Sequence, residues 1–324
     1  MLIFVATALL FDFLNGFHDS ANAVATMISS RAMGPRKALM LNAIANFVGP
    51  FLFGVAVAET IGHEVIAENA ASYTVVLAAL VGAILWNVFT WLMGLPSSSS
   101  HALIGGLVGA AIMGHGFNAL LLPGLEKVLL ALFLSPIIGM FSGFLLMKLT
   151  LFLARGATPK INYFFKRAQL VTSTTLALSH GANDAQKTMG MITMVLLAEG
   201  TLQHFVVPTW VIAACAGAMS LGTAMGGWKI IRTLGAKFYK VRPVHSFTSQ
   251  AASAGIILGT AIFGAPVSTT QVVSTAILGA GAADRLNKIR WGVVGEIMVA
   301  WLLTIPAAGL FGAIAYLGLQ YIGL

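Results

Sequence analysis

The chain has 324 residues, of which 58% are hydrophobic and only 9% charged, with a mean hydropathy of +0.91. No water-soluble domain of this size could expose so much apolar surface, so the composition excludes a soluble enzyme or binding module and indicates a polytopic membrane protein. The net charge of +8 does not indicate a nucleic-acid partner, because the basic residues lie in short gaps between apolar runs.

The basic residues predict which loops face the cytoplasm, because membrane proteins keep Lys and Arg on that side. Four gaps contain all of them except Lys127 and Lys187: Arg31, Arg36 and Lys37; Lys148, Arg155, Lys160, Lys166 and Arg167; Lys229, Arg232, Lys237, Lys240 and Arg242; and Arg285, Lys288 and Arg290. The gap with Glu59, Glu64 and Glu68, and the short gap around Glu199, contain no Lys or Arg and are expected to face outward. The single cysteine, Cys215, excludes an intramolecular disulfide. We therefore expect a multi-pass protein of the cytoplasmic membrane.

The first half of the chain contains four apolar segments, and a membrane helix needs about 20 such residues to cross the hydrocarbon. Polar residues interrupt the run 2–30 at 15–22, so we expect a broken helix there, retained and not cleaved as a signal peptide. Residues 38–58 and 120–147 predict full spans. Residues 74–113 contain a Gly-x-Pro-x-Ser turn and predict a re-entrant hairpin that returns to its own side.

The second half repeats this order of elements. Residues 170–197 predict a helix broken at 180–187, residues 206–225 and 291–319 predict full spans, and residues 247–280 predict a second re-entrant hairpin. Asp184 stands in the second half where Asp19 stands in the first, and Ser268 corresponds to Ser98 in the same way. Polar interruptions at matching places of two halves are typical of secondary transporters with a site at the repeat interface.

The loop charges place the two halves in opposite orientations across the membrane. We therefore expect an all-α polytopic membrane protein with two inverted repeats, broken helices and re-entrant hairpins. The expected divisions are an N-terminal repeat at 1–153, a basic cytoplasmic linker at 154–167 and a C-terminal repeat at 168–324.

The turns of the two hairpins are the first candidate site. Irregular backbone at membrane depth persists only where protein, water or ligand satisfies its polar groups. Hydroxyls there, with free N–H groups at the starts of the following helices, form a cradle suited to an oxyanion. The candidate anion ligands are Ser98, Ser99, Ser100, Ser268, Thr269 and Thr270. A plain polar loop is the alternative, but such a loop would not recur in the second half at a matching proline.

Two acidic residues lie in the other pair of motifs. A charged Asp near the bilayer centre costs about 2.5–3.5 kcal/mol, so Asp19 and Asp184 need partners. Two carboxylates would repel an oxyanion, so we expect anion to bind only when a proton, a sodium ion or a divalent metal enters with it. Asn15, Asn22 and Asn183 could contribute hydrogen bonds or carbonyl oxygens around the same point. N-capping of helix fragments is a structural alternative for these residues.

Lys187 is the one cation inside a motif, and it could pair with Asp184, bind the anion or replace a coupling cation. Five further titratable residues flank the motifs or hold matching positions: His18, His101, His180, Glu126 and Glu296. The histidines could carry protons near neutral pH, although a lone His is more often structural. The glutamates could be interface residues, and Glu296 stays a coupling candidate. No nucleotide-binding loop, zinc-protease motif or nucleophile elbow occurs, so we expect neither an enzyme nor a cofactor.

At these residues the sequence resembles the Pit family of inorganic phosphate transporters. Residues 15–26 and 179–187 look like its paired Gly-x-Asn-Asp signatures, and residues 95–101 and 266–271 look like its paired phosphate-binding loops. The resemblance runs nearly end to end. It implies an inverted-repeat helical transporter that imports inorganic phosphate with a cation, as a homodimer in the lipid bilayer.

The resemblance also implies roles for individual residues. The serines and threonines of the hairpin turns become phosphate ligands, with Asn22 and Gln271 beside them. Cation or proton sites are implied at Asp19, Asn22, Asn183 and Asp184. No resident metal is implied.

Two departures from the sodium-coupled members bear on the coupling ion. The second copy has Lys187 where those members have Asn, and the first copy has His18 before Asp19 where they have Asn. Both sequence variants are similar to those of the bacterial low-affinity branch. The resemblance to this branch implies proton coupling and, often, transport of a metal–phosphate complex. We therefore expect a proton-coupled phosphate symporter, with divalent metal as a candidate co-substrate and sodium coupling as the alternative.

Three other functions stay open. A sulfate permease of the same fold would use the same cradle, because hydroxyls and amides bind either tetrahedral oxyanion. A membrane-embedded enzyme acting on a phosphate-containing lipid or pyrophosphate would need a nucleophile or metal cluster beside the cradle. An anion channel would show flux without coupling to a cation gradient.

Overall fold

The structure is a computed structural model that describes residues 1–323, and nearly all of its elements are helices. The first half contains α1 (Leu2–Ser29), α2 (Pro35–Leu52), α3 (Ala56–His63), η1 (Glu68–Ala70), α4 (Tyr73–Met93), α5 (Ser99–His115), η2 (Phe117–Ala119) and α6 (Leu122–Leu153). The second half contains α7 (Ile161–Ala198), α8 (Thr209–Met225), α9 (Trp228–Arg232), the π-helix η3 (Thr233–Lys237), α10 (Pro243–Ile262), α11 (Thr269–Arg285), η4 (Leu286–Lys288) and α12 (Trp291–Tyr321).

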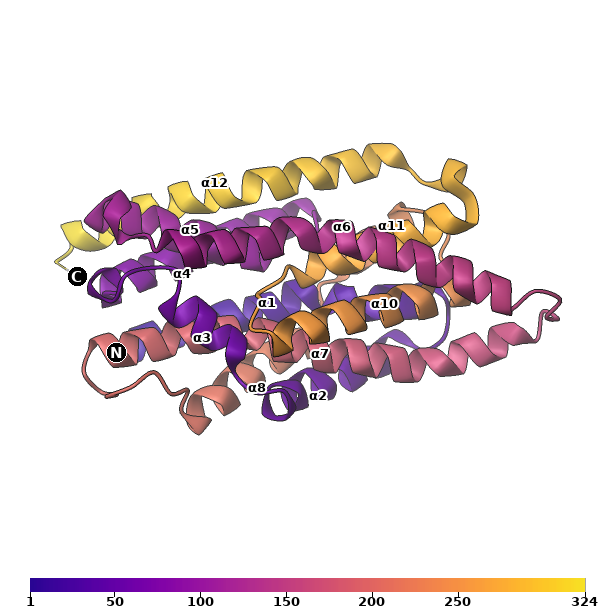
Figure 1. Ribbon diagram of the computed structural model, residues 1–324, viewed down its shortest axis with the longest axis horizontal. Coiled ribbons are helices and arrows are strands. Elements are labelled where there is room, and N and C mark those ends of the chain that lie inside the picture. Colours follow the sequence, from indigo (N-terminus) through magenta and orange to yellow (C-terminus); the bar gives the residue numbers. More distant parts are fainter. Residues whose placement is uncertain (324) are drawn as a thin grey trace.

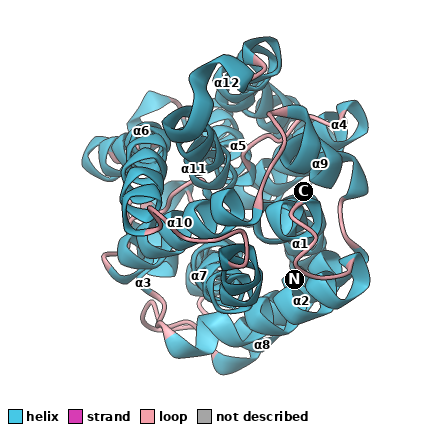
Figure 2. Ribbon diagram, turned by 90° about the vertical axis from the view of Figure 1, so that its right-hand side faces the viewer, coloured by secondary structure: helices cyan, strands magenta, loops and turns pink. Residues whose placement is uncertain are grey.

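The helices form an elongated bundle whose two termini lie at the same end (Figure 1). Seen along the long axis, α1, α5, α7, α10 and α11 lie in the interior, with α6 and α12 on one side and α2 and α8 on the other (Figure 2). The interior position of α1 and α7 follows from their composition, because both carry the polar motifs. Polar residues at membrane depth must face protein and not lipid.

The order of elements repeats, and α1 runs antiparallel to α7. Ser30, just after α1, donates to Gln169 near the start of α7 (2.7 Å), whereas Thr188 near its end donates to Asp12 early in α1 (2.5 Å). This arrangement agrees with the predicted inverted repeats.

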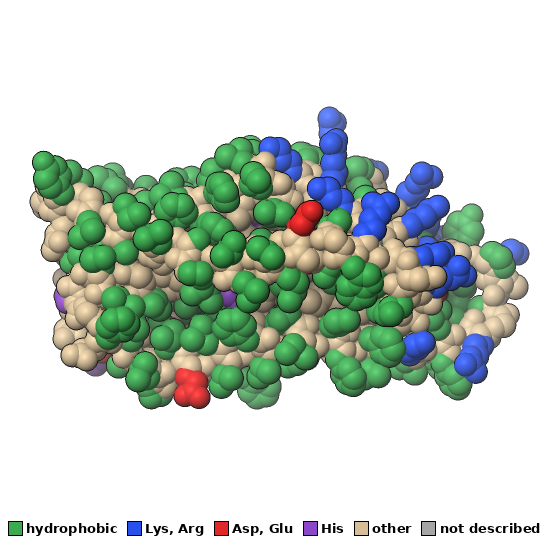
Figure 3. Space-filling view, turned by 90° about the horizontal axis from the view of Figure 1, so that it is seen from above, with side chains coloured by type: hydrophobic (Ala, Val, Ile, Leu, Met, Phe, Trp, Pro, Cys, Tyr) green, Lys and Arg blue, Asp and Glu red, His purple; other side chains and the backbone are tan. Residues whose placement is uncertain are grey.

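Within residues 1–323, four helices are long and apolar enough to cross a membrane, namely α1, α4, α6 and α12. The number rises to six if α2 with α3 and α8 with α9 and η3 each count as one bent span. The Lys and Arg side chains gather at one end of the molecule, while hydrophobic side chains cover much of the rest (Figure 3). By the positive-inside rule this basic end faces the cytoplasm.

The predicted breaks in α1 and α7 are wrong, because both helices continue through their polar motifs. The motif glycines allow neighbouring helices to pack closely and do not produce a bend. A Cβ at Gly16 would lie 2.0 Å from the Met219 carbonyl oxygen, and one at Gly181 would lie 2.3 Å from that of Asn46. Small residues commonly allow membrane helices to approach in this way.

The bends lie in the neighbouring helices instead. The expected span 38–58 is divided between α2 and α3 at an angle of 76°, and α8 turns by 60° into α9 and η3. Gly54 and Gly226 adopt positive φ (77° and 73°) at these bends. The motif helices satisfy the freed backbone: Gln186 of α7 accepts from Val57 N (2.9 Å), and Ser20 of α1 accepts from Gly227 N (2.8 Å). Polar residues of the motifs therefore hold both bends in place.

The two predicted hairpins are confirmed as α4–α5 and α10–α11, each turning at its Gly-x-Pro-x-Ser sequence. Gly94 and Gly264 take positive φ at the turns, and Ser98 and Ser268 cap the helices that follow. Ser100 Oγ donates to the Val267 carbonyl oxygen (3.1 Å), so the two tips meet between the repeats.

Close packing of α8 on α1 yields a first testable prediction. A Cβ at Gly222 would lie 1.9 Å from the Phe13 carbonyl oxygen, whereas one at Gly217 of the same helix meets nothing within 4 Å. We expect Gly222→Val to destabilise the protein by about 1–3 kcal/mol or more, because the backbone of α1 must move. Thermal unfolding in detergent measures this, with Gly217→Val as the control. Equal melting temperatures for the two variants would contradict the packing role.

Candidate functional site

The meeting point of the hairpin tips with α1 and α7 gathers most of the predicted site residues. Their side chains are all buried, although they are polar or charged. Buried polar groups persist only when they bond to one another or to a ligand, so the bonding pattern defines the site.

Asp19 is surrounded by hydrogen-bond donors. Its Oδ2 accepts from Ser99 Oγ (3.0 Å) and its Oδ1 accepts from Thr270 Oγ1 (2.8 Å), so both hairpins contribute. His18 Nδ1 lies 2.9 Å from Asp19 Oδ1. The side-chain amide oxygen Oδ1 of Asn15 also accepts from Ser99 Oγ (2.7 Å). The carboxylate thus depends on one hydroxyl from each repeat.

Asp184 has the corresponding place on α7 and a cationic partner. Lys187 Nζ contacts its Oδ1, and Thr269 Oγ1 donates to its Oδ2 (2.6 Å). His180 Nε2 lies 2.9 Å from the same Oδ2. The ammonium of Lys187 also donates to Ser100 Oγ (2.5 Å) and to the Val267 carbonyl oxygen (2.9 Å). Lys187 therefore joins the α7 carboxylate to both hairpin tips.

The two halves of the site correspond to each other but differ at three motif positions of α1 and α7, which are Asn15 and His180, His18 and Asn183, and Asn22 and Lys187. Asn22 Nδ2 donates to Thr270 (3.1 Å), and Lys187, its counterpart in the second repeat, donates to Ser100, the counterpart of Thr270. The geometry is therefore pseudo-symmetric, with an ammonium in one half where the other half has an amide.

Hydroxyl donors and carboxylate acceptors bind each other directly in this structure. A Ser or Thr hydroxyl carries one proton to donate. Thr269 donates its proton to Asp184, Thr270 donates its proton to Asp19, and Ser99 shares its proton between Asn15 Oδ1 and Asp19. An oxyanion bound by the same hydroxyls must therefore take these donors away from the carboxylates.

Three of these residues form a group that could hold a metal ion. Ligand atoms of Asp19, His180 and Asp184 all lie within 4.8 Å of one another. Carboxylate oxygens suit hard divalent cations, and imidazole suits several transition metals. The sequence predicts no resident metal but allows a divalent metal as cargo, and this group fits that second role.

Several predicted residues lie beside the cluster without joining its bonds. Ser98 and Ser268 are engaged as N-caps, accepting from His101 N (3.1 Å) and Gln271 N (3.2 Å). Asn183 is buried on α7, and neither of its side-chain polar atoms has a hydrogen-bond partner. Such a residue is available to a ligand that enters the site.

Two predicted residues point elsewhere. Gln271 lines an apolar cavity of about 760 Å³ between α6 and α12, because it follows Thr270 by one residue and therefore lies about 100° around α11. Glu296 is exposed on α12, so the structure does not bring this coupling candidate to the cluster. A carboxylate on the outer face of a lipid-facing helix is an interface residue.

The sequence reasoning missed Asp12, a fully buried carboxylate on α1. It lies seven residues, or two helical turns, before Asp19, on the same face of the helix. Thr188, next to Lys187, donates to its Oδ1 (2.5 Å), and its Oδ2 has no hydrogen-bond partner. The spacing from Asp19 was the available signal, but Asp12 lies outside the repeated motif.

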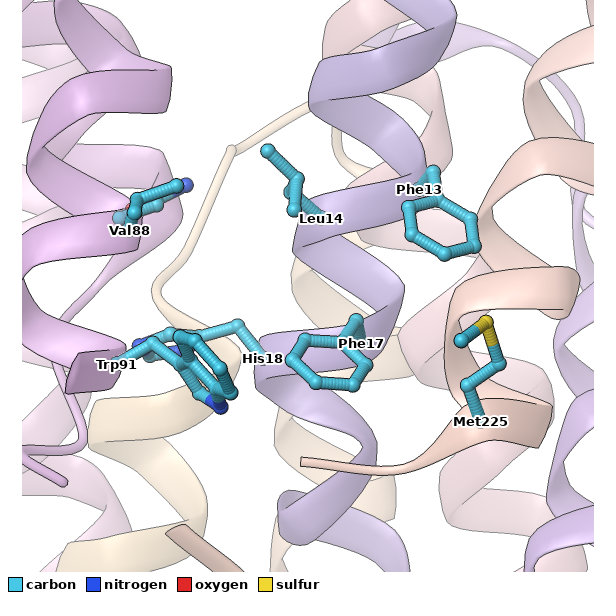
Figure 4. A pocket seen from close by; sticks show the side chains of 8 residues that line it. Phe13, Leu14, Phe17, His18, Val88, Trp91 and Met225 are labelled. Carbon is cyan, nitrogen blue, oxygen red and sulfur yellow. The ribbon is translucent and has the colours of Figure 1, made fainter. Parts of the chain in front are cut away.

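A cavity of about 230 Å³ lies beside His18, between α1, α4 and α8. Figure 4 shows its lining, in which Phe13, Phe17, Trp91 and Met225 surround the space beside His18. Aromatic and aliphatic walls do not suit a phosphate anion, so the bonded cluster and not this cavity is the candidate substrate site.

Comparison with known proteins agrees with this geometry. Residues 15–158 and 153–312 each match the phosphate transporter family. A protein of Bacillus subtilis (strain 168) described as a probable low-affinity inorganic phosphate transporter is 46% identical, over 99% of this chain and 97% of its own. A protein of the same description from Rhizobium meliloti (strain 1021) is 44% identical, over 96% and 94% respectively.

A solved structure described as the sodium-dependent phosphate transporter has the same fold. It superposes with a TM-score of 0.89 over 99% of each chain, at 23% sequence identity. The likeness confirms the predicted all-α membrane architecture.

Proposed function

Because the chain belongs to the phosphate transporter family, we propose that it is a secondary active symporter that imports inorganic phosphate with protons across the cytoplasmic membrane. The single observation that carries the proposal is Lys187, whose ammonium occupies the α7 side of the cluster and contacts Asp184, Ser100 and the Val267 carbonyl. The family consists of transporters, so the expectation that the protein is not an enzyme is confirmed.

Competition for hydroxyl protons gives symport a physical cause. Phosphate can accept from Ser99, Thr269 and Thr270 only if Asp19 and Asp184 release them. A buried carboxylate that loses these donors keeps its charge with fewer hydrogen bonds to stabilise it, which is costly. A proton or another cation that arrives with phosphate removes this cost, and so the two bind together.

Lys187 favours the proton as that cation. Its ammonium is bound by a carboxylate, a hydroxyl and a carbonyl oxygen, which is the kind of oxygen set that binds a small hard cation. A sodium ion cannot share this position with the ammonium. Lys187 therefore acts as a built-in substitute for sodium, and coupling passes to the neighbouring titratable groups.

Asp12 supplies a place for a proton near the cluster. No basic group lies in ion-pair contact with it among residues 1–323, and the hydroxyl of Thr188 donates to one of its two oxygens only. A buried carboxylate without a cationic partner is more stable protonated than charged. Asp12 accepts from Thr188, and Thr188 is the residue directly after Lys187 in α7. A proton on Asp12 would therefore lie close to the ion pair of Lys187 with Asp184.

The group formed by Asp19, His180 and Asp184 allows phosphate to travel with a divalent metal. A metal–phosphate complex brings positive charge to the two carboxylates and presents phosphate oxygens to the hydroxyls, so it satisfies both halves of the site together. We propose this complex as a second form of the substrate.

Uptake of labelled phosphate into proteoliposomes tests the proposal. We expect a pH gradient, acid outside, to drive accumulation of about tenfold per unit for each coupled proton. A protonophore should abolish it, and a sodium gradient of the same size should not replace it. Excess sulfate should leave uptake unchanged, and added Mg²⁺ should stimulate it.

Three results would contradict this reading. Uptake that requires sodium would overturn the coupling argument. Competition by sulfate would reassign the cradle to that oxyanion. Flux indifferent to both gradients would indicate a channel.

A further inference from the structure

The basic end of the molecule contains a cavity of about 540 Å³ between the end of α1, the segment before α10 and the start of α12. Four cationic residues line it, Arg31, Lys240, Arg242 and Arg290, and no acidic residue does. We call this cavity the basic vestibule. Arg242 pairs with Asp284 (2.6 Å), whereas among residues 1–323 the other three have no acidic partner in ion-pair contact.

Arg31 has an unusual backbone in this cavity. Its φ of 57° makes it the only non-glycine residue in the described chain with a left-handed conformation. Arg31 follows the C-cap residue Ser30 of α1, where a left-handed residue commonly ends a helix, and Ala32 N donates to the Met27 carbonyl oxygen (3.1 Å) across this turn. Arg31 lines the vestibule directly after Ser29 and Ser30, which also line it.

A polar track connects the vestibule with the cluster of Asp19 and Asp184. On α1, Asn22, Thr26 and Ser30 follow one another at intervals of four residues and share a face. Gln250 of α10 donates to Thr26 Oγ1 (3.2 Å). Gln169 of α7 accepts from Ser30 Oγ (2.7 Å) and donates to the Pro243 carbonyl (3.1 Å). Ser30 and Pro243 both line the vestibule, so Gln169 closes the track where it reaches the cavity.

The track contains buried polar atoms that no group satisfies. Asn22 Oδ1, Ser246 Oγ and Ser253 Oγ have no hydrogen-bond partner. Ser246, Gln250 and Ser253 lie on one face of α10 because their spacing is four and three residues. Helix packing alone would satisfy such atoms or replace them with apolar groups. These atoms are therefore free to bond to water or to an anion that enters the track.

The other repeat shows that the fold does not require these polar residues. At the matching positions of that repeat, Thr26, Ser30 and Gln169 correspond to Met191, Val195 and Phe4, while Ser246 and Gln250 correspond to Val76 and Leu80. All five counterparts are buried in one apolar core cluster. The track is therefore polar only on the cytoplasmic side of the cluster.

We propose that the basic vestibule is a second anion-binding site, in which phosphate is held on its way from the cluster to the cytoplasm, and that Gln169 is the residue that closes the connecting track. The proposal rests on phosphate being the substrate, but not on protons being the coupling ion. Arginine and lysine side chains without acidic partners bind phosphate groups through charge-assisted hydrogen bonds.

Thiol labelling tests the track without depending on coupling. The single cysteine, Cys215, is fully buried, so the unmodified protein is the blank. We expect Ser246→Cys to react with a membrane-impermeant thiol reagent in inside-out vesicles and not in right-side-out vesicles. Inorganic phosphate should slow the reaction at least threefold, and Gln169→Ala should accelerate it. The matched control is Val76→Cys, its counterpart in the other repeat, which should stay unlabelled from either face.

Charge removal tests the vestibule itself. We expect the double variant Arg31→Gln, Arg290→Gln to raise the phosphate concentration for half-maximal exchange at the cytoplasmic face by about tenfold and to leave the value at the outer face unchanged. Arg36→Gln, Lys37→Gln removes two charges from the first turn of α2, outside the vestibule, and should change neither value.

Three outcomes would overturn the proposal. The first is equal labelling of Ser246→Cys and Val76→Cys. The second is weaker phosphate exchange at both faces in the double variant Arg31→Gln, Arg290→Gln. The third is protection of the thiol by vesicles of anionic lipid but not by phosphate, which would make the cavity a lipid headgroup site. Failure of the coupling proposal would appear differently, as sodium-driven uptake with the sidedness of labelling intact.

Discussion

Replacement of Asp184 by asparagine is expected to reduce phosphate accumulation to the level of empty liposomes while the protein stays folded. The amide keeps the volume of the carboxylate and can still accept from Thr269. It removes the charge that pairs with Lys187. Removal of one partner from a buried ion pair destabilises the folded arrangement by about 3–5 kcal/mol, because the other charge stays buried without a partner. A difference of that size corresponds to a loss of at least about a hundredfold in the population of the working arrangement.

The Asp184→Asn experiment needs a control for charge alone. Glu64→Gln is suitable, because Glu64 pairs with Lys127 at 2.9 Å with both side chains more than 40% exposed. An exposed pair contributes about 0–1 kcal/mol, so this variant should transport normally. Size-exclusion chromatography in detergent checks folding of both proteins. Full accumulation by Asp184→Asn would remove Asp184 from the coupling mechanism.

The composition of the candidate site could be predicted from the sequence because lipid leaves few places for polar residues. Asp19, Asp184, Lys187 and the hairpin hydroxyls lie in motifs that recur at matching places of the two halves, and residues this costly in hydrocarbon must lie together inside the protein. The structure brings them into direct contact. The hairpins were predictable for a similar reason, since Gly and Pro at matching positions mark turns.

The path of the helices through the motifs could not be predicted in this way. A glycine in a polar segment can permit a bend or a close contact, and only the neighbouring helix decides which. At Gly16 and Gly181 it is a contact, with Met219 and Asn46 respectively. The motif also does not predict which side of a helix each side chain occupies. Thr270 faces the cluster, whereas its neighbour Gln271 points away from it. Asp12 was missed because it has no acidic counterpart in the second repeat, where Ala177 holds the matching position.

Replacement of Lys187 by asparagine should exchange proton dependence for a sodium requirement. The variant gives the second repeat the residue that the first repeat has at Asn22. Without the ammonium, Asp184, Ser100 and the Val267 carbonyl present three oxygen groups with no cation among them. We expect uptake without sodium to fall at least about tenfold, because the loss of a buried partner costs more than about 1.4 kcal/mol. Added sodium should restore part of it.

The sodium response is the decisive part of the Lys187 experiment, because many changes at a buried ion pair would lower uptake. Lys127→Asn removes an exposed ammonium from a surface pair and should leave uptake and its ion dependence unchanged. Uptake by Lys187→Asn should be measured at a fixed pH gradient over a series of sodium concentrations, with potassium as the balancing ion. A loss that sodium does not restore would mean that Lys187 holds Asp184 and Ser100 in place without standing in for a cation. A sodium-dependent recovery would mean that one residue on α7 selects the coupling ion in a site whose other parts serve either one.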